Sequence, residues 1–352
     1  MPARVTVISA FHNRADGVDH SLRSLAAQDG IDFRAVIVDD GSTDGTLDRL
    51  RQFESDRIRI VAQRNVGFTQ TMVNHCADAD TDYIALHGAG DESLPGRLAA
   101  QAAFLDQHPN VVAVGCGIEN VDEISGRRWE VVPEATIKRG PMVGGFGITH
   151  GEVMFRRSAY QQAGGYRTLF QVGQATDLFR RLSRLGDFGY VPDILYRRFL
   201  RLDGVNAKLD KVAQREVLLS ISAAVQRRAV EAGAPQDGSA RLKDELDRYG
   251  LLFPYFSEPD AHVAQSLARA AVKLWMGGDR RLALRLGRRS LAERVTGQGL
   301  KTYAAILLGV GPLDKPMKSL VAKASKAQKE NDFSRFGSRD KPGDAPTAEK
   351  IG

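Results

Sequence analysis

Two neighbouring carboxylates, Asp39 and Asp40, end an apolar run and precede a Gly-Ser-Thr turn in IVDDGSTDGT, residues 37–46. Carboxylates at the end of a strand can accept hydrogen bonds from the N–H of a nucleobase or from ribose hydroxyls. The same residue types also form Asx-turns and helix N-caps, so a purely structural interpretation stays open. Under the first interpretation, this segment binds a nucleotide.

The elements that must position these residues are strands alternating with helices. Amphipathic segments at 43–54, with Ser42 or Thr43 as N-cap, and at 94–107 are typical of helices. Near-continuous apolar runs favour strands buried on both faces, and they occur at RVTVISAF, FRAVIVDD, IRIVAQ, YIALHG and VVAVGCG. The alternation predicts an α/β fold with a mostly parallel sheet flanked by helices. Ligands bind such a sheet where its strands end, which selects the loops SAFHNR, DDGSTD, QRNVG and HGAGDE.

The second half of the chain changes character. A hairpin turning at Ser125-Gly126, two helices and a last strand, YVPDILYRRF, follow the first five strands. From about residue 206 the periodicity is helical, and the predicted helices are 208–232, 239–250, 259–276, 280–293 and 298–309. We therefore expect a domain at 1–205, an all-helical domain at 206–312 and a basic, largely disordered tail at 313–352.

Four motifs in order, VTVISAFHNR, VIVDDGSTDGT, QRNVGFTQTMVN and GDESLPGRL, resemble those of the family 2 glycosyltransferases. The resemblance covers residues 4 to about 203. It implies a GT-A (Rossmann-like) fold, a nucleotide-diphospho-sugar donor and a hydroxyl acceptor. It also implies that the backbone of Ser9 and Ala10 lines the nucleobase pocket. Asp40, with Asp39 beside it, would hold a uracil-like base or the ribose.

The resemblance further implies which residues approach the diphosphate. Asn65 and Gly67 match an N-x-G turn that packs by the ribose and diphosphate. Arg14 falls in the loop after the first strand and would face the same cleft, although a solvated surface arginine is an equally good interpretation. Arg197 or Arg198, after the last strand, could offset the charge of the leaving group. A solvated strand edge explains these two arginines equally well.

The turn before Pro95 departs from the family pattern D-x-D-D-x-x-x-P. Gly88 and Gly90 stand where the pattern has acids that serve the ribose and a divalent metal, and Asp91 is the remaining acid. Mg²⁺ and Mn²⁺ need oxygen ligands, which glycine side chains do not supply. The sequence therefore assigns no metal ligand and leaves a divalent metal as an open cofactor.

A second departure concerns the base that deprotonates the acceptor. The family pattern places Glu-Asp before D-L-x-x-R-L, but this chain has Gln174 and Ala175 there, and neither can take the proton. Histidine has a suitable intrinsic pKa, although a lone histidine beside glycines is also typical of a structural residue. The remaining candidates for a catalytic role are Asp91, Asp177 and His150, with Glu152 as a further nearby base.

Two functions remain open from the sequence. The first is an inverting glycosyltransferase that builds a surface polysaccharide or glycoconjugate. The alternative is a catalytically inactive GT-A domain that serves as a nucleotide-binding or scaffold subunit. The missing acids favour the alternative, whereas the four complete loops favour the enzyme, which is our prediction.

Bulk composition limits the partners and the location. The 352 residues carry a formal charge of +6, half of it in 313–352, and no nucleic-acid motif accompanies that charge. Cys76 and Cys116 form neither a disulfide framework nor a zinc motif, which favours a reduced cytoplasm. No signal peptide and no apolar run of membrane-spanning length is present. Residues 302–323, apolar and then lysine-rich, could lie on the inner face of the membrane or simply pack as a helix.

Overall fold

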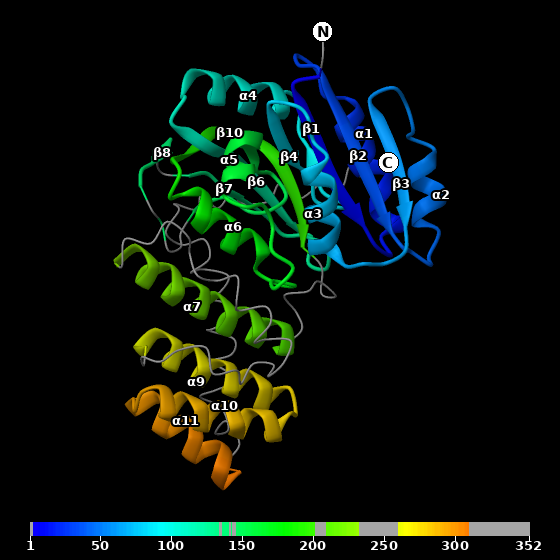
Figure 1. The fold of residues 1–352 in the computed structure, drawn as a ribbon. Coiled ribbons are helices and arrows are strands. Elements are labelled where there is room, and N and C mark those ends of the chain that lie inside the picture. The colour runs from blue at the N-terminus through cyan, green and yellow to red at the C-terminus, as the bar shows by residue number, and fades with distance from the viewer. Residues whose placement is uncertain are drawn as a thin grey trace, which may run out of the picture.

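The structure, a computed structural model, describes residues 3–133, 136–140, 142, 146–200, 209–231 and 260–309. Within these residues, a sheet with helices on both faces is followed by a group of packed helices (Figure 1). The expected boundary at 205, the expected helix at 239–250 and the expected tail at 313–352 lie outside the described residues.

Ten strands of the described chain join in one sheet, in the order β3-β2-β1-β4-β9-β6-β10-β5, with β7 paired to β6 and β8 to β10. The strands are β1 (Val5–Phe11), β2 (Phe33–Asp40), β3 (Ile58–Gln63), β4 (Tyr83–Leu86), β5 (Glu92–Ser93), β6 (Val111–Asp122), β7 (Arg128–Val131), β8 (Ile137–Lys138), β9 (Met154–Arg156) and β10 (Asp187–Leu200).

The direction of the strands decides where their ends lie. Strands β3, β2, β1 and β4 are parallel, and so are β6 and β10. Because β9 pairs antiparallel with both β4 and β6, those two strands also run the same way. The sheet is mixed, since the short strands β5, β7, β8 and β9 contribute antiparallel pairings. The carboxyl ends of β1, β2, β3, β4, β6 and β10 nevertheless share one edge.

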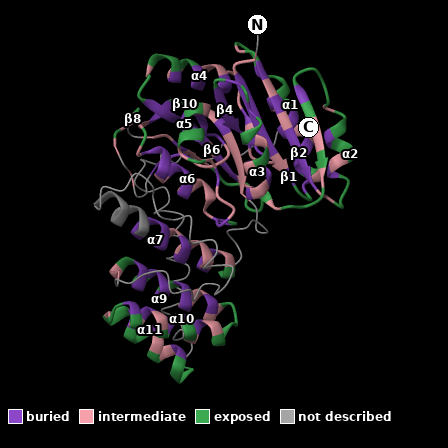
Figure 2. Ribbon diagram, viewed as in Figure 1, coloured by how far each residue is buried: buried purple, intermediate pink, exposed green. Residues whose placement is uncertain are grey.

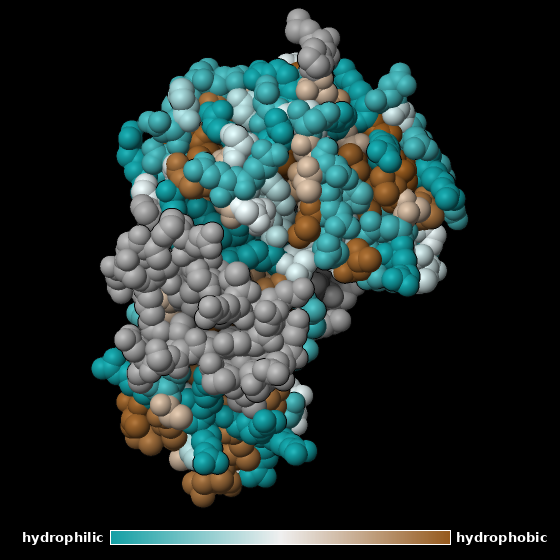
Figure 3. Space-filling view, in the orientation of Figure 1, coloured by the Kyte–Doolittle hydropathy of each residue, from teal (hydrophilic) through white to brown (hydrophobic). Residues whose placement is uncertain are grey.

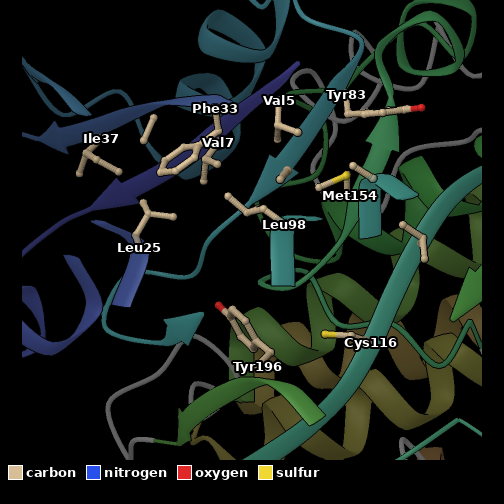
Figure 4. Packing of buried hydrophobic residues seen from close by; sticks show 14 of the residues in the cluster. Val5, Val7, Leu25, Phe33, Ile37, Tyr83, Leu98, Cys116, Met154 and Tyr196 are labelled. Carbon is tan, nitrogen blue, oxygen red and sulfur yellow. The ribbon is translucent and has the colours of Figure 1, made fainter. Parts of the chain in front are cut away.

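Helices cover both faces of the sheet. Many strand residues are therefore buried, as the purple segments of Figure 2 show. On one face, side chains of α1 and α4 pack on strand residues such as Val5, Val7 and Ile37 (Figure 4). On the other face, α3, α5 and α6 pack on residues such as Ile8 and Ile84. The helices are α1 (Val18–Ala26), α2 (Thr46–Arg51), α3 (Phe68–Ala77), α4 (Arg97–Gln107), α5 (Arg157–Gln162) and α6 (Gln174–Leu182), with a 3-10 turn η1 (Ala15–Gly17).

The predicted N-cap of the second helix is wrong. Helix α2 begins after Gly45, which has a left-handed φ of 83° and offers no side-chain cap. Ser42 and Thr43 serve a contact between loops instead. The backbone N–H of Asn13 donates to Ser42 Oγ at 2.9 Å, and the N–H of Thr43 donates to Asn13 Oδ1 at 2.8 Å.

A second core joins the helical part to the sheet. Phe170, which precedes α6, is buried together with apolar side chains of the four later helices. Arg180 of α6 donates to the carbonyl of Leu219 in α7 at 2.7 Å. These helices are α7 (Leu209–Glu231), α9 (Ala261–Met276), α10 (Arg280–Glu293) and α11 (Gly297–Leu308), and they confirm the predicted helical C-terminal region over the residues described there. In the described part of the chain, no helix has the length and apolar character needed to cross a membrane.

Candidate active site

The four polar loops selected from the sequence lie together at the shared edge of the sheet. Strand register places Phe11 beside Asp39 and Asp40 beside Gln63, so the loops after β1, β2 and β3 are neighbours. The turn after β4 joins them because β4 pairs with β1. The fold thus brings residues separated by up to about 80 positions in sequence to one surface, as parallel strands require.

Asp40 shapes the loop after β3. Its carboxylate accepts hydrogen bonds from Gln63 Nε2 at 2.8 Å and from the backbone N–H groups of Val66 and Gly67, both at 2.9 Å. Only 3% of Asp40 is exposed. The side chain therefore fixes the turn that contains Asn65 and Gly67, which brings three of the predicted site residues together.

His12 is a contact at this edge that the sequence interpretation missed. Its Nδ1 lies 3.0 Å from the carbonyl oxygen of Asp40 and 3.1 Å from Nδ2 of Asn65. The ring is exposed and bridges the loops after β1 and β3. Its place directly after the first strand was the available signal.

Asp39 lies near the carboxyl end of β2, and Ser9 and Ala10 lie near the carboxyl end of β1. Asp39 Oδ2 accepts from the backbone N–H of Ser42 at 3.1 Å. In the described structure, Asp39 Oδ1 and Ser9 Oγ are buried and have no hydrogen-bond partner. Such groups are rare in folded proteins, because leaving a buried polar atom unpaired costs stability.

Arg14 reaches the centre of the edge. Its backbone N–H donates to Thr46 Oγ1 at 2.8 Å, and its guanidinium contacts Glu123 at 3.1 Å and Asp16 at 3.5 Å. Glu123 directly follows β6, and its own N–H donates to the carbonyl of Leu200 at the end of β10. The guanidinium thus lies between loops that follow β1 and β6, and 10% of the side chain is exposed.

Asp91 connects the turn after β4 to β10. Tyr196 O–H donates to Asp91 Oδ2 at 2.8 Å, and the N–H of Phe199 donates to Oδ1 at 3.0 Å. The N–H of Gly88 donates in turn to the Tyr196 hydroxyl at 2.8 Å. Burial raises the pKa of Asp91 to about 6, although these hydrogen bonds and the charges of Arg198 and His20 oppose the shift.

The residues of this turn do not fit a divalent metal. Gly88 and Gly90 offer no side-chain oxygen, and both oxygens of Asp91 already accept hydrogen bonds from protein groups. No group of three or more His, Cys, Asp or Glu side chains in the described residues is arranged to hold an ion. Mg²⁺ prefers several oxygen ligands in a regular arrangement, which this turn does not supply.

Asp177 is buried between α6 and α7. It accepts from Arg167 Nε at 3.0 Å, from Arg181 Nη2 at 2.8 Å and from Ser222 Oγ at 3.1 Å. Burial would raise its pKa, but the two guanidinium groups outweigh that effect and hold the pKa below its usual value. None of these partners belongs to the four loops, so the contacts describe a link to the helical region. Its catalytic role stays a prediction.

The loop before β9 contains the other candidate bases. His150 Nε2 lies 2.7 Å from the Tyr166 hydroxyl, and burial lowers its pKa to about 4. Glu152 is fully buried, accepts from the backbone and hydroxyl of Thr149, and has a pKa raised by burial. A pKa near 4 makes His150 a weak base at neutral pH, and its predicted role is untested.

Gln174 and Ala175, at the start of α6, stand where the family pattern has its carboxylates. Gln174 Oε1 is buried and, among the described residues, has no hydrogen-bond partner. The two arginines of β10 are engaged with polar side chains. Arg197 forms ion pairs with Glu92 and Glu119, and Arg198 Nε donates to Asn120 Oδ1 at 3.0 Å. Their predicted diphosphate role stays a prediction.

The mixed sheet, its flanking helices and the loops at one edge define a GT-A glycosyltransferase fold. The crystal structure of S. aureus TarS 1–349 in complex with UDP-GlcNAc has this fold: the TM-score is 0.56 at 15% identity, over 86% of this chain and 90% of that one. The model of Glycosyl transferase family 2 matches residues 6–164. The putative glycosyltransferase EpsE of Bacillus subtilis is 33% identical over 201 residues, which cover 55% of this chain and 72% of EpsE. The chain belongs to glycosyltransferase family 2 and is a transferase.

A further relative indicates how far the likeness extends. The succinoglycan biosynthesis protein ExoO of Rhizobium meliloti is 29% identical over 155 residues, which cover 43% of each chain. The likeness to ExoO thus spans less than half of that protein. The matched family segment ends at residue 164, before the helical region begins.

Proposed function

We propose that the chain transfers a sugar from a nucleoside diphosphate sugar to an acceptor hydroxyl, with inversion at the anomeric carbon. The acceptor oxygen would form a bond to that carbon as the bond to the diphosphate oxygen breaks, and a base would take the hydroxyl proton. The observation that carries the proposal is the meeting of four family-matched loops at one edge, where Asp40 fixes the Asn65–Gly67 turn.

The unpaired polar atoms near the carboxyl ends of β1 and β2 favour a nucleobase with an N–H donor, such as uracil. Asp39 Oδ1 is an acceptor that no described protein group satisfies, and Ser9 Oγ beside the same edge is also without a partner. A base that donates to Asp39 would offset the cost of leaving this acceptor unpaired. The TarS complex with UDP-GlcNAc has the same fold, which is consistent with a uridine donor.

Asp91 is our candidate for the general base. A base works best when its pKa is near the operating pH, and burial brings the pKa of Asp91 to about 6. Gly88 and Gly151 pack closely against Asp91 Oδ2, since an added Cβ would lie 2.3 Å and 3.1 Å from that oxygen. In the proposed reaction, the Asp91 carboxylate takes the proton of the acceptor hydroxyl.

The proposed acceptor is a growing surface polysaccharide or related glycoconjugate at the inner face of the membrane. The relative ExoO supports this class, because it is a succinoglycan biosynthesis protein. Helix α11 supports the membrane contact, because Leu300, Leu307 and Leu308 are exposed and Lys301 lies beside them. Hydrophobic surface is visible at this end of the helical region in Figure 3.

A calorimetric screen of nucleoside diphosphates and their sugars tests the donor. We expect UDP and a UDP-sugar to bind, and the bound sugar to be transferred to an acceptor hydroxyl or, without an acceptor, slowly to water. Product NMR would then give the anomeric configuration. If no nucleoside diphosphate binds, the proposed donor is refuted. Binding without transfer or hydrolysis of any bound donor would instead favour a non-catalytic subunit.

A further inference from the structure

The guanidinium of Arg14 fills the space where a side chain at Gly90 would begin. A Cβ added to Gly90 would lie 2.5 Å from Arg14 Nε, 2.8 Å from Nη2 and 3.0 Å from Cζ. Gly17 makes room on another side, since its Cβ would lie 2.9 Å from Arg14 Nε and 2.8 Å from the Cα of Gly90. The guanidinium therefore lies where a side chain at position 90 would be, which is where the family pattern has an acid.

The arginine is held in this place from both ends. Its backbone N–H donates to Thr46 Oγ1, and Thr46 is itself bonded through its N–H to Asp44 Oδ1 at 3.1 Å. At the other end, Glu123 Oε1 accepts from Nη2 at 3.1 Å. The side chain is nine-tenths buried between these contacts. Such a guanidinium loses little conformational freedom when it binds a ligand.

We propose that Arg14 is the cation that binds the donor diphosphate in this chain, in place of a divalent metal; the inference rests on the proposed function. A guanidinium presents donors in a planar fork that matches phosphate oxygens, and its attraction to them strengthens in a partly buried cleft. Arg14 contacts the turn after β4 and the residue after β6, so it lies at the centre of the edge.

Glu123 is the counter-ion of Arg14 in the absence of donor. A diphosphate carries more negative charge than one carboxylate, so it would replace Glu123 as the partner of Nη2. The role of Glu123 can therefore be tested. If Glu123 were a metal ligand, its loss would weaken binding. If it competes with the diphosphate, its loss would strengthen binding.

The arginines of β10 are weaker candidates for this role. Both ends of the Arg197 guanidinium are engaged, with Nη1 on Glu92 and Nε on Glu119. Arg198 Nε donates to Asn120 Oδ1. Arg14 lies against the turn itself, whereas these two arginines lie along a strand. Arg14 is therefore the stronger candidate for the cation that binds the diphosphate.

The test is a calorimetric titration of the full chain with UDP and with uridine, in Mn²⁺ and in EDTA; GDP and guanosine replace them if the donor screen selects guanine. The variants are Arg14→Gln, Arg14→Lys and Glu123→Gln. Arg49→Gln is the control, because Arg49 is an exposed arginine of α2 with one carboxylate partner, Asp19. Uridine binding shows whether each variant keeps its nucleoside site.

We expect wild-type UDP affinity to change by less than about threefold between Mn²⁺ and EDTA. Arg14→Gln should weaken UDP by about tenfold or more, the size of a lost charged hydrogen bond, and uridine by less than about twofold. Arg14→Lys should weaken UDP less than Arg14→Gln does, and Glu123→Gln should tighten it.

Several results would overturn the inference. One is a tenfold or greater loss of UDP affinity in EDTA, and another is an unchanged affinity in Arg14→Gln. Equal losses for UDP and uridine in both Arg14 variants would assign the arginine a purely structural role. Weaker UDP binding in Glu123→Gln would point to a metal ligand. Each of these leaves the proposed function standing, whereas failure of the wild type to bind any nucleoside or its diphosphate would remove both.

Discussion

Asp91→Asn should change how the stability of the protein depends on pH. The fold raises the pKa of Asp91 from 3.8 to about 6, because the carboxyl is buried between the turn after β4 and the end of β10. Asparagine has nearly the same shape but does not titrate. The difference between the two proteins therefore isolates the proton on this one carboxyl.

The sign follows from linkage between proton binding and folding. Below the unfolded pKa, the carboxyl is protonated in both states, and its full contribution to stability is present. As pH rises through the folded pKa, the proton is lost from a buried group and that contribution disappears. A shift of about two units corresponds to about 3 kcal/mol, of which about 2 kcal/mol is lost between about pH 4.5 and about pH 7.

Urea unfolding of the wild type and Asp91→Asn at a series of pH values measures this difference. We expect the wild-type free energy of unfolding, relative to the variant, to fall as pH rises across that window. Asp48→Asn is a control, because Asp48 is an exposed carboxylate of α2. A wild-type–variant difference that stays constant with pH would refute the raised pKa.

Ionisation of the same carboxyl should have the opposite effect on activity. A general base must be ionised, so the rate of sugar transfer should rise through about pH 6 as stability falls. Above about pH 7, where the base is ionised, Asp91→Asn should lose about a hundredfold or more of this rate, and the loss should shrink below about pH 6. A variant that keeps the wild-type rate would leave Asp91 as a link between the turn and β10.

Three further predictions address the rest of the molecule. Asp40→Ala frees the Asn65–Gly67 turn and should weaken UDP binding by about 1.5–3 kcal/mol in calorimetry; undiminished affinity would contradict this role. Asp177→Ala leaves Arg167 and Arg181 without their buried partner and should lower the free energy of unfolding by about 3–5 kcal/mol in urea; a loss below about 1 kcal/mol would contradict the link. The full chain should sediment with anionic but not neutral vesicles, less so in Leu307→Asp, and be released by salt; no binding at low salt would remove the membrane contact.

Long periodic patterns made most of the fold predictable. The predicted helix at 280–293 is α10 with the same bounds, and the predicted helix at 259–276 is close to α9. The first three strand predictions agree closely with β1, β2 and β3, because each is a run rich in apolar residues; β1 and most of β2 are buried, whereas β3 at the edge of the sheet is only partly buried. In such segments local preference and burial favour the same conformation.

The hairpin predicted at Ser125-Gly126 is formed by β6 and β7, but the short strands β5, β8 and β9 were beyond a sequence interpretation. Strand β9 has three residues, Met154–Arg156, in a segment whose glycines are typical of a loop. It forms because β4 and β6 offer it hydrogen bonds on both sides. Its pairing is a property of the folded sheet and leaves no periodic trace in three residues. Strand β9 is one of the four short strands whose antiparallel pairings make the sheet mixed.

The site was predictable in its loops and not in its contacts. Carboxylates, glycines and an Asn-x-Gly turn after apolar runs were enough to select the edge. Whether Asp40 faces a ligand or holds the Asn65–Gly67 turn depends on backbone N–H groups more than 20 residues away. The contact between Arg14 and Gly90 joins residues even further apart in sequence. Spacing along the chain carries no information about such a pair.

The two glycines of the turn after β4 have separate physical reasons, and together they explain why the turn lacks acids. Gly88 leaves space for the Asp91 carboxylate, which would lie 2.3 Å from an added Cβ. Gly90 leaves space for the Arg14 guanidinium and has a left-handed φ of 85°, which side chains rarely adopt. An aspartate at position 90 would therefore collide with the cation and strain the backbone. Removing two acids also removes the negative charge that a divalent ion would neutralise. The missing acids and the buried arginine are thus one arrangement, in which the positive charge is part of the chain.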